Sequence, residues 1–103
     1  MDYGIDDLMR ILKNIKNNPY GIKEAPHAFD RAQKRGIDLN MVTQFLNDGI
    51  PVGIQKTFND SMKFELLYEY SKFSDLSIVI NIWDEEDIEV VTVIEKESSR
   101  RKH

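Results

Sequence analysis

The segment His27–Gly49, HAFDRAQKRGIDLNMVTQFLNDG, decides the fold that we expect for this chain. Gly36 divides it, because a glycine after a helix readily adopts the left-handed conformation that lets the chain reverse. Apolar residues recur at helical spacing on both sides of the break: Ala28, Phe29 and Ala32, then Met41, Val42, Phe45 and Leu46. The segment therefore predicts two short helices, 27–35 and 39–48, with Asp38 as the N-cap of the second.

The first of these helices carries the concentrated positive charge of the expected fold. Its basic residues follow one another at intervals that share one helical face: His27, Arg31, Lys34 and Arg35. We expect the arginines and the lysine to bind RNA phosphates, and His27 is a candidate catalytic base. Two other interpretations stay open. The face fits an ordinary solvated surface whose arginines pair with carboxylates, and His27 fits a capping or packing residue.

Length and composition predict a single globular domain. The chain has 103 residues, of which 41% are apolar and 31% charged. A chain of this length can bury a hydrophobic core without disulfides or a structural metal. It has no cysteine, which excludes disulfides and thiolate metal sites. We see neither a signal-peptide pattern nor an apolar run of membrane-spanning length, and expect a cytoplasmic protein. The net charge of −4 argues against extensive nucleic-acid binding but permits a local basic patch.

Helix and strand periods define the remaining elements. Apolar residues at three- and four-residue steps predict a helix at 5–16, with acidic residues in its first turn and lysines near its end. After Pro51 the period changes to two, which predicts strands at about 50–58, 62–71, 76–83 and 88–95, with 76–83 central. In the last strand, alternation places Ile88, Val90, Thr92 and Ile94 on one face.

Short turns between these strands indicate an antiparallel meander, because parallel pairs need long crossovers. We therefore expect an α+β fold in which the N-terminal helices pack on one face of a three- to four-stranded antiparallel sheet. Residues 1–95 form this single domain, and 96–103 form a flexible basic tail.

The order of these parts resembles an uncharacterised domain family allied to the RelE/ParE-like toxins. The resemblance covers about residues 22–94 and rests on His27, Arg31, the Arg35-Gly36-Ile37 break, Val42, Leu46, Gly49 and the terminal Val91-Thr92-Val93. It implies a RelE-like fold and, from the best-known relatives, a ribonuclease toxin that cuts mRNA and is paired with an antitoxin. The expected partners are thus RNA or the ribosome, and an antitoxin-like protein.

RNA cleavage of this kind needs a base, an acid and cations, and no metal. His27 is the candidate base, and Tyr68 and Tyr70 are candidate additional site residues, although their alternation with Phe64 and Leu66 favours buried core aromatics. The last strand supplies no arginine or tyrosine, so the toxin-type site is incomplete unless the basic tail folds back over the sheet.

No cofactor or metal is expected. The acidic turn Asp84–Asp87 lacks the glycine and the distal glutamate of a calcium loop, which favours a solvated hairpin tip. Beside it, Trp83 either covers the second face of the sheet or marks a partner surface.

Three functions stay open on the sequence. The first is RNA contact through the basic face, with or without cleavage. The second is a non-enzymatic protein–protein interaction module that docks a partner on a sheet edge or on the first helix. The third is a metal-independent hydrolase of unknown substrate. The sequence does not give the oligomeric state.

Overall fold

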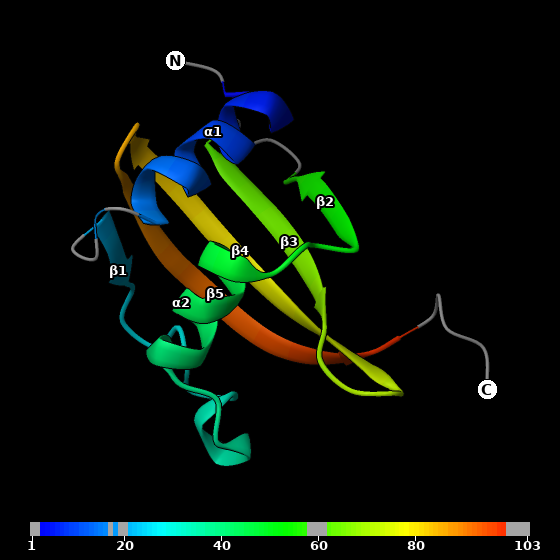
Figure 1. Cartoon of the computed structure of the whole chain (residues 1–103). Helices are drawn as coiled ribbons and strands as arrows, with labels where there is room; N and C mark the ends of the chain where they lie inside the picture. Colours follow the sequence, from blue (N-terminus) through cyan, green and yellow to red (C-terminus); the bar gives the residue numbers. More distant parts are fainter. Residues whose placement is uncertain (1–2, 17, 19–20, 58–61, 99–103) are drawn as a thin grey trace.

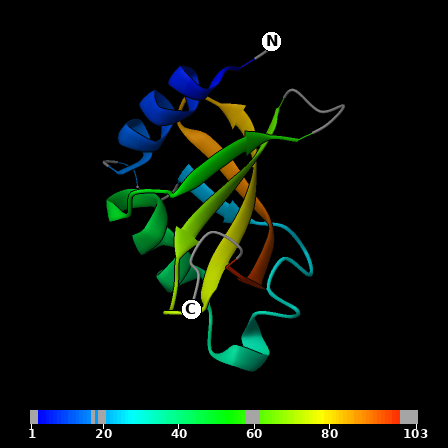
Figure 2. The ribbon, with the colours of Figure 1, turned by 90° about the vertical axis from the view of Figure 1, so that its right-hand side faces the viewer.

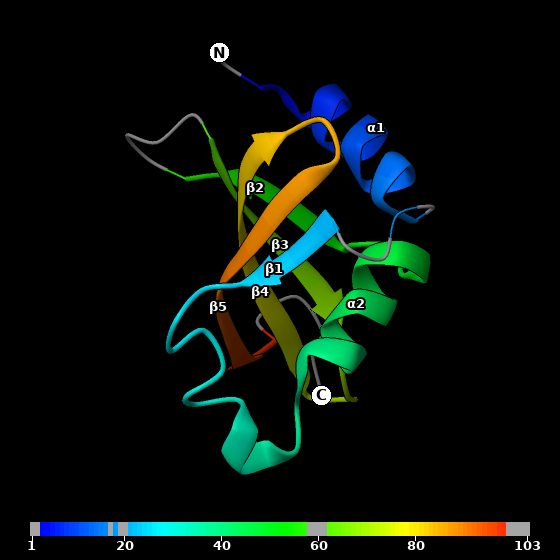
Figure 3. The same cartoon turned by 90° about the vertical axis from the view of Figure 1, so that its left-hand side faces the viewer.

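The computed structural model describes residues 3–16, 18, 21–57 and 62–98 (Figure 1). It contains α1 (Ile5–Lys16), β1 (Ile22–Glu24), the 3-10 helix η2 (Gln33–Arg35), α2 (Leu39–Asp48), β2 (Gly53–Lys56), β3 (Lys63–Glu69), β4 (Ser74–Asp84) and β5 (Asp87–Glu97). Two α-helices lie on one side of a twisted sheet, as the side views show (Figures 2 and 3). The expected α+β class is confirmed.

The sheet differs from the expected meander. It has five strands in the order β1-β5-β4-β3-β2, and β1 pairs with β5 in parallel. The expectation of three to four antiparallel strands is therefore wrong. The parallel edge arises because the chain enters the sheet at β1, crosses it through α2, and returns to the neighbouring position only in the last strand.

α1 spans the range that its amphipathic spacing predicts. Its buried stripe consists of Leu8, Ile11, Leu12 and Ile15. The carboxylate of Asp7 accepts a hydrogen bond of 2.8 Å from the backbone N–H of Gly4, which satisfies one free donor of the first turn. This hydrogen bond and the neighbouring Arg10 hold the pKa of Asp7 below its usual value.

α2 begins and ends at the residues expected from the sequence. Asp38 is its N-cap, because the carboxylate accepts a hydrogen bond of 3.0 Å from the backbone N–H of Met41. At the other end the chain leaves the helix at Gly49, where a Cβ would lie 2.7 Å from the backbone oxygen of Phe45. Only glycine permits this close approach.

The prediction of a helix at 27–35 is wrong. Residues 26–32 form successive turns, and only η2 is helical. His27 has a φ of 67°, which an α-helix does not accommodate. The backbone oxygen of Ala28 instead accepts a hydrogen bond of 3.1 Å from the N–H of Val93, so the turns are fastened to β5. Gly36, with a φ of 76°, is the left-handed cap predicted for the end of this segment.

β4 occupies the middle of the sheet, as expected, and supplies the core from its helix-covered face. Leu76, Ile78, Ile80 and Ile82 are fully buried. Opposite Val79 and Ile80 the register of β5 shifts, which leaves Val91 as the extra residue of a β-bulge. Because of the bulge, Val93 pairs with Ile78 and is buried. The simple alternation predicted for 88–95, with Thr92 and Ile94 beside Val90, therefore fails after Val90.

The sheet edges and the tail also need correction. β2 spans four residues, fewer than the expected 50–58, and Phe58 lies outside the described residues. β5 includes Lys96 and Glu97, and the N–H of the buried Ser98 donates to the backbone oxygen of Phe73 at 3.0 Å. Residues 96–98 are therefore not part of a flexible tail, and residues 99–103 of the expected tail lie outside the described part. None of the described helices is long and apolar enough to span a membrane.

Candidate functional site

The basic residues predicted from the sequence share one surface without sharing a helix. Arg31, Lys34 and Arg35 line an open hollow of about 620 Å³ together with Ala32, Ile94 and Glu95. We call residues 27–35 the basic segment. The bond from Val93 to Ala28 fixes its turns along β5, and η2 then carries the lysine and the second arginine to the same side.

The three cations of the hollow are not equivalent. Arg35 forms an ion pair of 2.9 Å with Glu95, whose side chain is only 18% exposed and also accepts a hydrogen bond of 2.6 Å from the Ser74 hydroxyl. Arg35 therefore fastens the basic segment to β5. Arg31 and Lys34 are exposed and have no ion-pair partner among the described residues. These two side chains are available to a ligand.

His27 lies in an exposed turn, with 84% of its side chain accessible. Its Nδ1 is 2.8 Å from the carboxylate of Asp30, which orients the ring. The two hollows that His27 lines also contain Glu24, Asp30 and Arg31, but no tyrosine. The structure thus brings His27 close to a carboxylate and a guanidinium, and not to the aromatic hydroxyls considered with it.

Tyr68 and Tyr70 lie in or against the core. Tyr68 is 1% exposed, its ring centroid is 5.4 Å from that of Phe45 in α2, and burial raises the pKa of its hydroxyl. Tyr70 is half-buried and packs against the same core. The hollow that Tyr68 lines, between α1 and α2, does not contain His27. The interpretation of these tyrosines as core aromatics fits their positions.

A second hollow, between α1 and α2, was missed by the sequence reasoning. It has a volume of about 590 Å³ and is lined by Met9, Arg10, Leu12, Lys13, Lys16, Leu46, Asn47, Gly49, Pro51 and Tyr68. We call it the α1–α2 groove. The apolar stripe of α1 could have indicated this hollow, because Met9 belongs to the stripe but is not covered by the core and stays 43% exposed. Only the placement of α2 shows that Met9 faces a hollow.

The acidic turn fastens α1 to the sheet. The guanidinium of Arg10 donates hydrogen bonds of 3.0 and 2.9 Å to Glu85 in the turn between β4 and β5. Trp83 beside it is 58% exposed, and its indole N–H donates to Glu89 at 3.2 Å. The described residues contain no cluster of three or more side chains suited to a metal ion.

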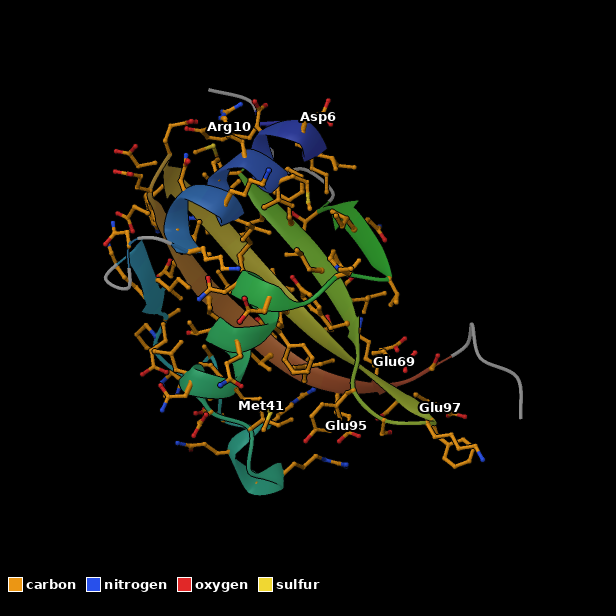
Figure 4. All side chains as sticks on the ribbon, in the orientation of Figure 1. Asp6, Arg10, Met41, Glu69, Glu95 and Glu97 are labelled. Atoms are coloured by element: carbon orange, nitrogen blue, oxygen red, sulfur yellow. The ribbon has the colours of Figure 1, made fainter. Side chains whose placement is uncertain are left out.

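The groove and the basic surface are separate. Arg10, on the rim of the α1–α2 groove, and Glu95, on the basic surface, lie at opposite ends of the sheet (Figure 4). A ligand of one surface therefore does not cover the other, and substitutions on one serve as controls for the other.

No protein-family model, curated protein or solved structure matches this chain. The relation to RelE/ParE-like toxins therefore stays a hypothesis from the sequence pattern, and the function has to be argued from the two surfaces themselves.

Proposed function

We propose that this chain is a non-enzymatic RNA-contacting domain in which Arg31 and Lys34 bind phosphate groups. The observation that supports the proposal is that both cations line one hollow and have no partner among the described residues. A cation that neutralises a phosphate releases counterions condensed on the nucleic acid. A cation without an internal partner breaks no ion pair when it does so.

The rest of the hollow suits a single strand. The half-buried Ile94 gives it an apolar part on which a ribose or a base can pack, and Glu95 is neutralised by Arg35. The carboxylate that lines this hollow therefore opposes binding little. The acidic balance of the whole chain, with a net charge of −4, favours contact through a local basic surface over contact along the whole molecule.

Cleavage is not part of the proposal. Attack by a ribose hydroxyl needs a base and an acid on either side of one phosphorus atom. His27 and Tyr68 line different hollows, and the tyrosine is 1% exposed. The separation of His27 from Tyr68 is the reason that the proposal is limited to RNA contact.

Fluorescence anisotropy with a short labelled single-stranded RNA tests the proposal. Two phosphate contacts predict a slope of about −1.4 for log K against log salt, since each contact on a single strand contributes about −0.7. The double variant Arg31→Ala/Lys34→Ala removes two charges from the basic surface. The control Lys13→Ala/Lys16→Ala removes the same net charge from α1.

We expect the first variant to lose binding and the control to retain it. Equal weakening by both variants would show that only net charge matters, and a wild-type affinity independent of salt would also refute the proposal.

A second candidate is a protein-docking module. β2 is the outermost strand and pairs only with β3 within the described sheet. Directly before it, Ile50 is 87% exposed and Val52 is 43% exposed. A free edge beside exposed apolar side chains can take an added strand from a partner. A partner bound in this way keeps its affinity as salt rises and loses it in Val52→Lys, the opposite of the pattern expected for RNA.

A further inference from the structure

The α1–α2 groove has the dimensions and walls of a small-molecule site. Its volume of about 590 Å³ lies within the range of roughly 300–1,000 Å³ that such sites occupy. Met9 and Leu12 line it from α1, and Leu46 lines it from α2. Pro51 and the ring of Tyr68 complete an apolar lining. The proposed RNA contact uses none of these residues.

The charged residues of the groove are all basic. Arg10, Lys13 and Lys16 contribute three cations, and no carboxylate belongs to the described lining. Two of these cations are already engaged, because Arg10 pairs with Asp7 and Glu85 and Lys16 pairs with an aspartate of α2 at 3.0 Å.

Lys13 is different, because it has no partner in the described parts of the chain. It lies on α1 between the two engaged cations. An anionic group that enters the groove therefore meets one ammonium group without an internal partner.

Two lining residues also carry buried polar atoms without partners. The hydroxyl of Tyr68 and the Oδ1 atom of Asn47 are shielded from solvent, and neither forms a hydrogen bond within the described structure. Such atoms are costly and few in native proteins, and a bound water or ligand group is one way to complete their hydrogen bonding. They occur in residues of the same groove, which separates this groove from the other hollows.

We propose that the α1–α2 groove binds a small amphipathic carboxylate. The apolar body of the ligand lies between Met9 and Leu12 of α1 and Leu46 of α2, and its carboxylate forms an ion pair with Lys13. The groove supplies no carboxylate to repel this charge, and an anion without an apolar body, such as inorganic phosphate, gains no binding energy from the apolar walls.

Isothermal titration calorimetry with 4-phenylbutanoate tests the proposal, with 4-phenylbutanamide as the neutral probe of the same shape. An ion pair with an exposed lysine predicts that the carboxylate binds roughly two- to fivefold more tightly than the amide. Lys13→Gln should remove this preference and leave the fold intact, because the lysine is exposed. The matched control Lys34→Gln removes the same charge from the basic surface and should leave the preference unchanged.

Met9→Ser gives a second, independent readout, because it shortens an exposed apolar wall without changing the charge. It should weaken both probes to a similar extent. Equal affinity for carboxylate and amide, or a preference that survives Lys13→Gln, would overturn the proposal. So would the absence of binding together with self-association that Met9→Ser abolishes, because the groove would then be covered by a second copy of the chain. None of these results bears on RNA binding, because the proposed RNA contact uses other residues. The groove proposal and the proposed function can therefore be refuted independently.

Discussion

Replacing Tyr68 with phenylalanine should stabilise the ligand-free protein. The substitution removes a hydroxyl that is buried and unpaired in the described structure, and it keeps the ring that packs on Phe45 at 5.4 Å. An unsatisfied buried polar group costs about 1–3 kcal/mol, so we expect the free energy of unfolding to rise by about 1 kcal/mol. For a domain of this size, that corresponds to a rise in Tm of roughly 4–8 °C.

The same substitution should change the response to alkaline pH. Burial raises the pKa of the Tyr68 hydroxyl above its ordinary value of about 10. Below that value the phenol is protonated in both states and its pKa does not affect stability. Above it, the unfolded state ionises first, so the wild-type protein loses stability as the pH rises. Tyr68→Phe lacks this contribution and should lose less.

Urea denaturation at neutral pH and above pH 10 measures both effects, with Tyr70→Phe as the control. Tyr70 is half-buried, and removal of its hydroxyl should change the neutral stability little. A loss of about 1 kcal/mol or more in Tyr68→Phe at neutral pH would refute the reasoning, because it would show that the hydroxyl has a partner that stabilises the fold.

Two further substitutions test the contacts that hold the sheet and the basic segment. Arg35→Ala leaves the mostly buried Glu95 without its ion-pair partner and should lower the free energy of unfolding by about 1 kcal/mol. The control Arg31→Ala should change it by less than about 0.5 kcal/mol; equal effects in thermal denaturation would contradict the anchoring role. Glu65→Gln should reduce the loss of stability in acid. The hydrogen bond from Lys96 holds the pKa of Glu65 below its usual value, so its contribution is present above the unfolded pKa and is lost as the pH falls. Parallel acid denaturation curves for wild type and variant would contradict this result.

The elements that the sequence predicted well are those fixed by local rules. α1 follows from a repeating apolar stripe, and α2 follows from a stripe and an N-cap at Asp38. β4 follows from strict alternation over a central strand. In each case neighbouring residues along the chain determine the outcome.

The basic segment and the sheet edges depended on distant contacts. Residues 27–35 have helical spacing, yet a hydrogen bond from Val93 and the left-handed backbone of His27 hold them in turns. β1 has three residues, too few for a periodic signal, and it forms only because β5 offers an edge. The bulge at Val91 reverses the alternation in β5 for the same kind of reason.

The candidate sites also divide into features set by local sequence and features set by distant contacts. Arg31 and Lys34 could be identified from the sequence because a surface cation needs only exposure and proximity. The ion pair between Arg35 and Glu95 joins residues that are 60 positions apart, and the α1–α2 groove depends on how two helices pack. No pattern within either helix contains that information.

The most direct measurement for the proposed function is a nuclear magnetic resonance titration of the isotope-labelled protein with a short single-stranded RNA. Shifts of backbone amides should be confined to residues 31–35 and to Ile94 beside them, and should fade as salt is added. Amides of α1 should not move. Shifts centred on α1 or β2, or the absence of any shift at low salt, would contradict RNA contact through Arg31 and Lys34.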